Sequence, residues 1–162
     1  MQELQPVEAV EAALSRYGDL LYRLCLVTLR NASDAEDAVQ ETLLAYLARA
    51  PVFNSPEHEK AWLLRVAVNK CRDVQRFRLR HPQLDETLLQ AQLPDEAPRA
   101  VMHALLSLPE RFRLVLTLHY VEGYRVNEIA GMIGRSPSAV KMRLQKGRRL
   151  LEAAYRKEHD HE

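Results

Sequence analysis

Three acidic side chains in the first half of the chain have a spacing that could support chemistry. Asp34, Asp37 and Glu41 lie at positions i, i+3 and i+7, so a helix would place them on one face. Such carboxylates could transfer protons or bind a metal ion. Di-metal helical bundles, however, also use Glu-x-x-His ligands from several inward-facing helices, and the sequence offers no such set. Two other interpretations stay open: a solvated helix start whose acids favour the helix dipole, and a docking face for a basic partner.

A basic segment near the C-terminus points to a polyanion as ligand. Residues 128–151 have the pattern of two helices joined by a turn at Gly134, with Ser136 as N-cap and Pro137 as the first residue of the second helix. The second helix carries no acid between residues 135 and 149. A short helix, a turn and a basic amphipathic helix form a helix-turn-helix, whose second helix enters the DNA major groove. A helical hairpin with a solvated basic face is the alternative. The basic side chains are Arg135, Lys141, Arg143, Lys146, Arg148 and Arg149.

A further basic run lies in the middle of the chain, at residues 69–80. It contains a single acid, Asp73, and an aromatic residue, Phe77, while Trp62 precedes it on the same expected helix. Cations beside aromatic rings suit a single nucleic-acid strand, because phosphates pair with the cations and bases stack on the rings. A basic helix end that complements its own dipole is the simpler interpretation, and core packing is the simpler one for Trp62.

These segments require helices to position them. Apolar residues recur at helical spacing over residues 7–30, where Gly18 could divide the helix in two, and again after a capping box that begins at Ser33. A third helix is expected to begin at Ser55-Pro56 and to end before Pro82. Helical pattern resumes near residue 99, and Pro109 opens a helix that should end at Gly123. We therefore predict an all-α chain of two small domains, residues 1–81 and 99–162, joined by a flexible acidic linker at 82–98.

Composition and charge agree with this organisation. Aromatic residues make up only 6% of the 162 residues and there are five glycines, which argues against a β-rich fold. The net charge is +1, but residues 111–162 carry 11 basic and six acidic side chains, so the basic charge is concentrated in the C-terminal third. Cys25 and Cys71 fall within apolar helical patterns and indicate reduced core residues of a cytoplasmic protein. The sequence predicts neither a signal peptide nor a membrane-inserted segment, nor a metal or cofactor site.

Four motifs together resemble the extracytoplasmic-function (ECF) sigma factors, the small two-domain group of the bacterial sigma-70 family. They occur in the order seen in that family, and the resemblance covers about residues 10–80 and 100–156. The four motifs are residues 34–41, residues 62–73, residues 108–116, and Glu128-Ile129-Ala130 followed by the basic helix. The resemblance implies a non-enzymatic subunit that binds core RNA polymerase and directs transcription initiation at promoters. It also implies an anti-sigma factor as a further partner.

The resemblance assigns roles to both domains. The N-terminal domain resembles sigma region 2, which docks on the β′ clamp of core polymerase and opens the −10 promoter element. The C-terminal domain resembles region 4, which contacts the β flap and recognises the −35 element. The implied polymerase-binding residues are Asp34, Asp37, Gln40 and Glu41. Those implied for the −10 strand, with a flipped base near Phe53 and Asn54, are Phe53, Asn54, Trp62, Asn69, Lys70, Arg72, Arg76 and Arg80.

The −35 residues lie on the basic helix. Lys141 and Gln145 have the side chains best suited to base edges, whereas Arg143, Lys146, Arg148 and Arg149 better suit phosphates. The segment departs from the family pattern at Arg125, where a Ser or Thr cap is usual, and at Ala139, where threonine is usual. The implied set is Arg135, Ser136, Ser138, Ala139, Lys141, Met142, Arg143, Gln145, Lys146, Arg148 and Arg149.

Two other functions are compatible with parts of the sequence. A stand-alone regulator could use the helix-turn-helix as a dimer on symmetric half-sites, but it would leave the basic run at residues 69–80 without a role. An enzyme could use the acidic cluster, but the sequence lacks a paired base, nucleophile or metal constellation.

Overall fold

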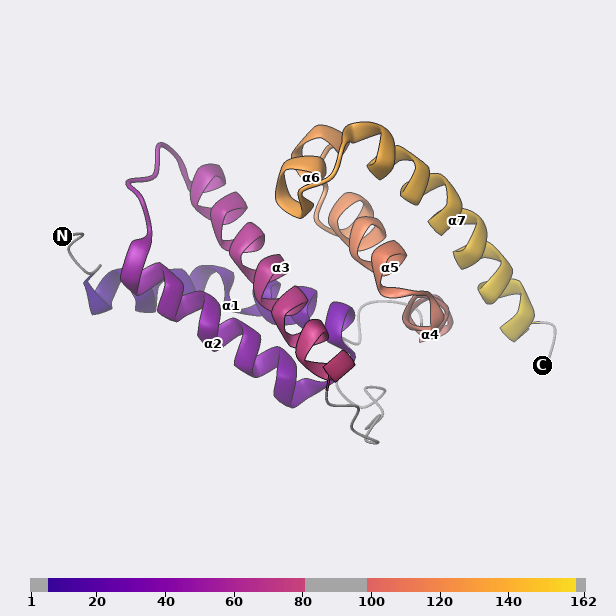
Figure 1. Cartoon of the computed structure of the whole chain (residues 1–162), viewed down its shortest axis with the longest axis horizontal. Coiled ribbons are helices and arrows are strands. Elements are labelled where there is room, and N and C mark those ends of the chain that lie inside the picture. Colours follow the sequence, from indigo (N-terminus) through magenta and orange to yellow (C-terminus); the bar gives the residue numbers. More distant parts are fainter. Residues whose placement is uncertain (1–5, 81–98, 160–162) are drawn as a thin grey trace. The chain divides into compact units, whose positions relative to one another are not determined.

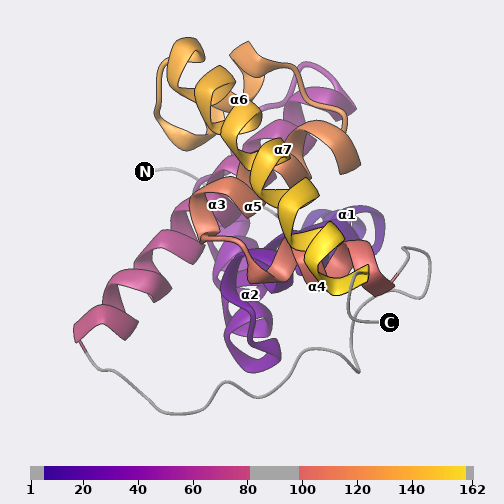
Figure 2. The ribbon, with the colours of Figure 1, turned by 90° about the vertical axis from the view of Figure 1, so that its right-hand side faces the viewer.

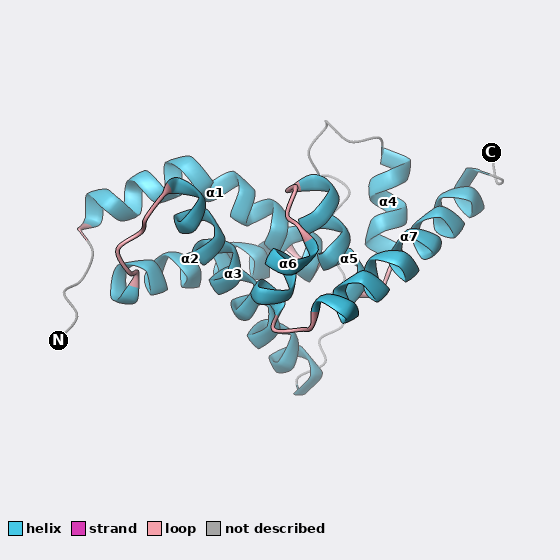
Figure 3. Ribbon diagram, turned by 90° about the horizontal axis from the view of Figure 1, so that it is seen from above, coloured by secondary structure: helices cyan, strands magenta, loops and turns pink. Residues whose placement is uncertain are grey.

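The structure, a computed structural model, describes residues 6–80 and 99–159, and the described residues form helices with no strand among them (Figures 1 and 3). The predicted all-α class is confirmed. The chain divides into two compact units, Met1–Glu86 and Thr87–Glu162. The predicted acidic linker at residues 82–98 lies outside the described residues. Within the described ranges no helix is both long and apolar enough to span a bilayer.

The first unit is a bundle of three helices: α1 (Val7–Leu29), α2 (Ala32–Arg49) and α3 (Pro56–Arg80). Its core is built from fully buried leucines of α1 and α3, among them Leu21, Leu24, Leu63 and Leu64. Cys25 and Cys71 are buried free thiols, as predicted. The division of α1 at Gly18 was wrong, because the helix is continuous. A helical glycine costs only about 1 kcal/mol relative to alanine, which the burial of the flanking apolar face outweighs.

The corner between α1 and α2 differs from the predicted capping box. Arg30 adopts a left-handed conformation (φ 58°), and its amide donates to the carbonyl of Leu26. Asn31 is the N-cap of α2, and its Oδ1 accepts a hydrogen bond from the amide of Asp34 at 2.9 Å. The helix therefore begins at Ala32, two residues before the expected start. Asparagine is as good an N-cap as serine, so the earlier cap stabilises an additional half-turn.

The second unit contains α4 (Arg99–Ser107), α5 (Glu110–Leu116), a π-helical turn η2 (Thr117–Val121), α6 (Val126–Ile133) and α7 (Pro137–His159). The long helix α7 packs against α4, α5 and α6 (Figure 2). Its core includes the fully buried side chains of Val115, Leu118, Ile129 and Ile133. One cation belongs to this core rather than to the surface: Arg113 is 6% exposed. Its Nη1 donates to the carbonyl of Leu108 at 2.6 Å.

The end of the helix that begins at Glu110 is wider than predicted. After Leu116 the chain forms a π turn, in which the amide of Glu122 donates to the carbonyl of Thr117 at 3.0 Å. Gly123, with φ 75°, then ends the helix as expected. The inserted residue rotates the last turn, so Tyr120 and Val121 are exposed, at 54% and 63%.

The turn between α6 and α7 follows the prediction. Gly134 ends α6 in a left-handed conformation (φ 69°), and its amide donates to the carbonyl of Ala130 at 3.0 Å. Ser136 caps α7, because its Oγ accepts a hydrogen bond from the amide of Ala139 at 3.1 Å. At the start of α6, arginine offers no side-chain acceptor, so only the Glu128 carboxylate contributes to the cap. It accepts from the amide of Arg125 at 3.0 Å.

Candidate nucleic-acid interface

A polar and basic stripe runs along one side of α3. With a rotation of about 100° per residue, the members of the stripe fall within an arc of roughly 80° on the helix circumference. Trp62 and Arg72 are half-buried and the other members are exposed. Arg65 was not among the residues predicted from the sequence. Its spacing of three residues from Trp62 and four from Asn69 places it on the same helix face and could have revealed it. The stripe comprises Trp62, Arg65, Asn69, Arg72, Arg76 and Arg80.

Two charged residues of α3 modify this arrangement. Asp73 lies beside the stripe and forms an exposed ion pair with Arg76, with Oδ1 and Nη1 3.8 Å apart. Such a pair contributes little to stability, so Arg76 can exchange it for a phosphate. Lys70 lies away from the stripe, and its Nζ is 4.0 Å from Oε2 of Glu41 on α2. The structure therefore groups Lys70 with the acidic face of α2 rather than with the other −10 candidates.

An aromatic cluster lies at the N-terminal end of the stripe. The ring of Trp62 lies 5.9 Å from that of Phe53 and 6.0 Å from that of Tyr46, and His58 is edge-on to Phe53 at 5.2 Å. Nδ1 of His58 accepts a hydrogen bond from the amide of Asn54 at 3.1 Å, which fixes the loop before α3. The structure thus places Phe53 beside Trp62, and Asn54 is exposed next to Phe53 in the same loop. Tyr46 was missed because only tertiary packing brings it to the loop, whereas the missed His58 lies four residues after Asn54 and its spacing was the available signal.

A polar network supports the cluster. The hydroxyl group of Tyr46 donates to Oε2 of Glu59 at 2.9 Å, and Oε1 of the same carboxylate is 3.7 Å from Nη1 of Arg16. The pKa of Tyr46 is raised to about 12, mainly because the hydroxyl group is buried and secondly because it donates a hydrogen bond to Glu59. The Tyr17 hydroxyl donates to the carbonyl of Pro56 at 3.1 Å. These contacts fix the start of α3 against α1 and α2, so the aromatic rings keep their relative orientation.

The acidic candidates on α2 separate into two environments. Asp37, Gln40 and Glu41 are exposed on one face of the helix, next to Leu44, whose side chain is 52% exposed. Asp34 is half-buried and forms an ion pair with Arg78 of α3. The structure thus brings together three of the four polymerase-binding candidates and leaves Asp34 engaged within the unit. The described residues contain no group of three or more His, Cys, Asp or Glu side chains that could hold a metal ion.

The N-terminal half of α7 presents a continuous exposed face. Helical periodicity aligns Ser138, Lys141, Met142, Gln145 and Arg149 on this face, and Met142 is 69% exposed. Arg135 and Ser136 are exposed at its N-terminal end, whereas Ala139 and Arg143 are half-buried at its side.

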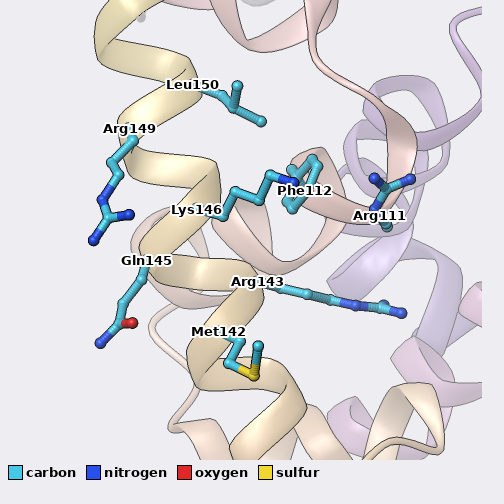
Figure 4. A pocket seen from close by; sticks show the side chains of 8 residues that line it. All are labelled: Arg111, Phe112, Met142, Arg143, Gln145, Lys146, Arg149 and Leu150. Atoms are coloured by element: carbon cyan, nitrogen blue, oxygen red, sulfur yellow. The ribbon is translucent and has the colours of Figure 1, made fainter.

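A groove of about 580 Å³ borders this face, between α5 and α7 (Figure 4). The buried ring of Phe112 lies between two cations: the guanidinium carbon of Arg111 is 4.6 Å from the ring centroid and Nζ of Lys146 is 5.7 Å from it. Gln145 and Arg149 point away from Phe112 in Figure 4. Lys146 is therefore held toward Phe112 by a cation–π contact, while Gln145 and Arg149 line the outer edge of the same groove.

Comparisons with known proteins agree with this two-unit arrangement. The family model "Sigma-70 region 2" matches residues 13–81, and "Sigma-70, region 4" matches residues 99–151. The chain is 28% identical to RNA polymerase sigma factor SigV of Bacillus subtilis, over 85% of each chain. It is 31% identical to ECF RNA polymerase sigma factor SigM of Mycobacterium tuberculosis, over 86% of this chain and 74% of the relative.

Other relatives and solved structures extend these matches. ECF RNA polymerase sigma factor SigL of Mycobacterium tuberculosis is 32% identical, over 89% of this chain and 90% of the relative. The sigma factor RpoE, in its complex with the anti-sigma factor NepR from Bartonella quintana, has the same fold, with a TM-score of 0.76 over 92% of this chain and 98% of RpoE at 22% identity. CnrH, in complex with the cytosolic domain of CnrY, is 27% identical, with a TM-score of 0.64 over 91% of this chain and 88% of CnrH. With matches to both regions and relatives similar over most of their length, the chain belongs to the ECF group of the sigma-70 family, the promoter-specificity subunits of RNA polymerase.

Proposed function

We propose that this sigma factor recognises a −10 element through α3 and the preceding loop, and a −35 element through α7, after binding core RNA polymerase. The observation that carries the proposal is the α3 stripe next to the aromatic cluster. Cations spaced along a helix can follow the phosphates of a single strand, and a neighbouring aromatic cluster can stack an unpaired base. Both parts of such a site are present within the first unit.

In this proposal the −10 strand crosses the stripe from Arg80 toward Trp62. Arg65, Arg72, Arg76 and Arg80 bind phosphates of the non-template strand, and Asn69 hydrogen-bonds a base or sugar. A base flipped out of the duplex stacks near Phe53 and Trp62 and is bound by polar groups around Asn54. Flipping costs a few kcal/mol, which stacking and hydrogen bonds in the pocket offset. The polar network below the cluster reduces the cost of binding, because the rings are already oriented.

The second unit recognises duplex DNA in this proposal. Lys141 and Gln145 on the exposed face of α7 contact base edges of the −35 element, while Arg148 and Arg149 contact phosphates. Arg143 and Lys146, which lie toward the groove at Phe112, contribute at the edge of this surface. Ser138 adds a small polar contact to this surface, and Met142 adds a flexible apolar contact.

Core polymerase binds the exposed face of α2. Asp37, Gln40 and Glu41 offer acceptors for a basic surface of the β′ clamp, and Leu44 adds apolar area beside them. The second unit contacts the β flap of the polymerase. Since the polymerase is cytoplasmic, the protein acts in the cytoplasm. This docking role fits the exposed acidic face, because its carboxylates are complementary to a basic partner surface.

We also propose regulation by an anti-sigma factor. This part of the proposal is supported by family membership and by the similarity to CnrH, which was solved with the cytosolic domain of CnrY bound. A protein that inhibits transcription by this sigma factor with core polymerase, and that forms a complex with the purified chain, would establish it. Transcription that no co-expressed protein inhibits would indicate control through synthesis or degradation alone.

In vitro transcription tests the central proposal. Core RNA polymerase is incubated with sheared genomic DNA, with and without this protein, and transcript 5′ ends are sequenced. New start sites that share −10 and −35 elements are expected. If no start site appears while the protein alone protects symmetric half-sites on duplex DNA, the protein is a dimeric regulator instead.

A further inference from the structure

The C-terminal end of α3 is tied to the corner between α1 and α2 by one side chain. Nη1 of Arg78 donates a hydrogen bond to the carbonyl of Leu29 at 2.7 Å, and its Nη2 donates to Oδ2 of Asp34. Arg78 and Asp34 are each about one-third exposed at the side chain, at 36% and 33%. The planar guanidinium thus connects three helices through two acceptors, a geometry that an ammonium group would not reproduce.

The surrounding residues of α3 make this contact important. In the last turn, Phe77 is 60% exposed and Leu79 is 85% exposed, and Arg80 is exposed as well. These apolar side chains therefore contribute little burial to hold the turn. Arg78 lies nearly opposite Arg76 on the helix circumference, because two residues correspond to a rotation of about 200°. It faces the bundle while the stripe faces away.

Both acceptors suit a cation. Leu29 is the last residue of α1, and its carbonyl is one of the four at the helix C-terminus that have no partner within the helix. These carbonyls carry the negative end of the helix dipole, which favours a nearby guanidinium. Asp34 is fixed in turn, since its amide donates to Asn31. The Arg78 side chain therefore meets two preorganised acceptors.

We propose that Asp34 and Arg78 form a clamp that positions the last two turns of α3, so that Arg76 and Arg80 meet the phosphates of the promoter strand. Asp34 is then a positioning residue for DNA, not a part of the polymerase-docking face. The inference rests on the proposed −10 function of the stripe. Phosphate contacts depend on the helix being formed to its end, because a frayed turn would have to be ordered at an entropic cost on binding.

Removing the negative charge of Asp34 distinguishes the clamp from a general electrostatic effect. Asp34→Ala removes a negative charge, so general electrostatics alone predicts equal or tighter DNA binding. The clamp predicts weaker DNA binding, because the released end of α3 would no longer hold its cations at positions that match the phosphates. Asp73→Ala is the matched control: it also removes one acid from the unit, but from the side of the stripe, and it leaves the clamp intact. It should bind DNA as tightly as the unchanged protein or more tightly.

The experiment uses the full chain assembled with core RNA polymerase and a fluorescent, partly single-stranded −10 promoter fragment. For Asp34→Ala we expect an affinity about three- to tenfold lower, corresponding to the loss of roughly one hydrogen-bonded contact. Affinity for core polymerase should be unchanged. Arg78→Lys should resemble Asp34→Ala, although it preserves the charge. In the free protein, the amides of residues 76–80 should exchange hydrogen faster in both variants.

Three results would overturn the clamp: DNA binding by Asp34→Ala that is as tight as that of the unchanged protein, weaker binding of this variant to core polymerase, or unaltered hydrogen exchange at residues 76–80. If the unchanged holoenzyme does not bind the fragment, the proposed −10 function fails. Hydrogen exchange in the free protein then still decides whether the clamp orders the end of α3.

Discussion

The hydroxyl group of Tyr120 accepts a hydrogen bond from Nη1 of Arg148, with the two atoms 2.6 Å apart. The π turn at residues 117–121 makes this contact possible, because its inserted residue turns Tyr120 outward beside α7. One of the five N–H donors of Arg148 is thereby used, and the others stay available to a phosphate. The local irregularity of η2 therefore positions a cation of the proposed DNA-binding surface.

Tyr120→Phe should weaken duplex binding modestly and equally on all sequences. The lost hydrogen bond is exposed, so we expect a decrease of about 0.5–1 kcal/mol, or roughly two- to fivefold in affinity. The slope of affinity against salt should not change, because the arginine and its charge remain. Fluorescence anisotropy with a −35 duplex and a scrambled duplex measures both quantities. A larger loss on the −35 duplex than on the scrambled one would contradict the positioning role.

Substitutions on α7 should separate base recognition from phosphate binding. Lys141→Ala and Gln145→Ala should alter the preference for −35 bases by about 1–3 kcal/mol at the contacted positions. Arg148→Ala should weaken binding to every sequence and reduce the salt slope by about one. Selection from a randomised −35 library, followed by salt titrations, distinguishes the two effects. Equal losses on all sequences for all three variants would reject this division.

Most helices of the fold could be predicted from local signals. Ser55, Gly134 and Ser136 act at helix ends through contacts within a few residues, so their roles follow from sequence. The cap at Asn31 and the continuity of α1 through Gly18 were missed. Each depends on a small free-energy difference between local helix preferences and tertiary packing. The π turn was missed for a different reason: a widened turn changes no residue pattern that a helical period would reveal.

The candidate site was predictable where it lies on one element. The α3 stripe and the exposed face of α7 follow from helical periodicity. The aromatic cluster was only half predicted, since Tyr46 comes from a different helix than Trp62. Arg78 and Arg113 resemble their surface neighbours in sequence, yet one clamps Asp34 and the other is buried against backbone carbonyls. Such pairings depend on tertiary distances that no spacing along the chain encodes.

The exposed face of α2 should be needed for binding to core polymerase. The double substitution Asp37→Ala and Gln40→Ala should weaken core binding at least fivefold without changing stability by more than about 0.5 kcal/mol, because both side chains are exposed. Glu11→Ala, an exposed acid of α1, is the control and should bind normally. Affinity is measured by fluorescence with labelled protein, and stability by urea unfolding. Unchanged core affinity of the double variant would reject the docking face.

Tyr46 should make the stability of the first unit sensitive to alkaline pH. Its folded-state pKa of about 12 exceeds the ordinary value of 10.0, so between these values the unfolded chain loses a proton that the folded chain retains. Stability contributed by this group is complete well below pH 10 and falls as pH rises toward 12, by at most about 3 kcal/mol.

Tyr46→Phe isolates this contribution, because it preserves the ring in the aromatic cluster and removes only the hydroxyl group that donates to Glu59. At neutral pH the variant should be less stable by about 1 kcal/mol. Between pH 10 and pH 11.5 the unchanged protein should lose more stability than the variant, so that the difference between them falls to zero and then changes sign. Urea unfolding of both proteins, followed by circular dichroism at several pH values, measures this difference. A difference that stays constant across this range would show that Tyr46 titrates alike in the folded and unfolded states, and that burial with Glu59 does not raise its pKa.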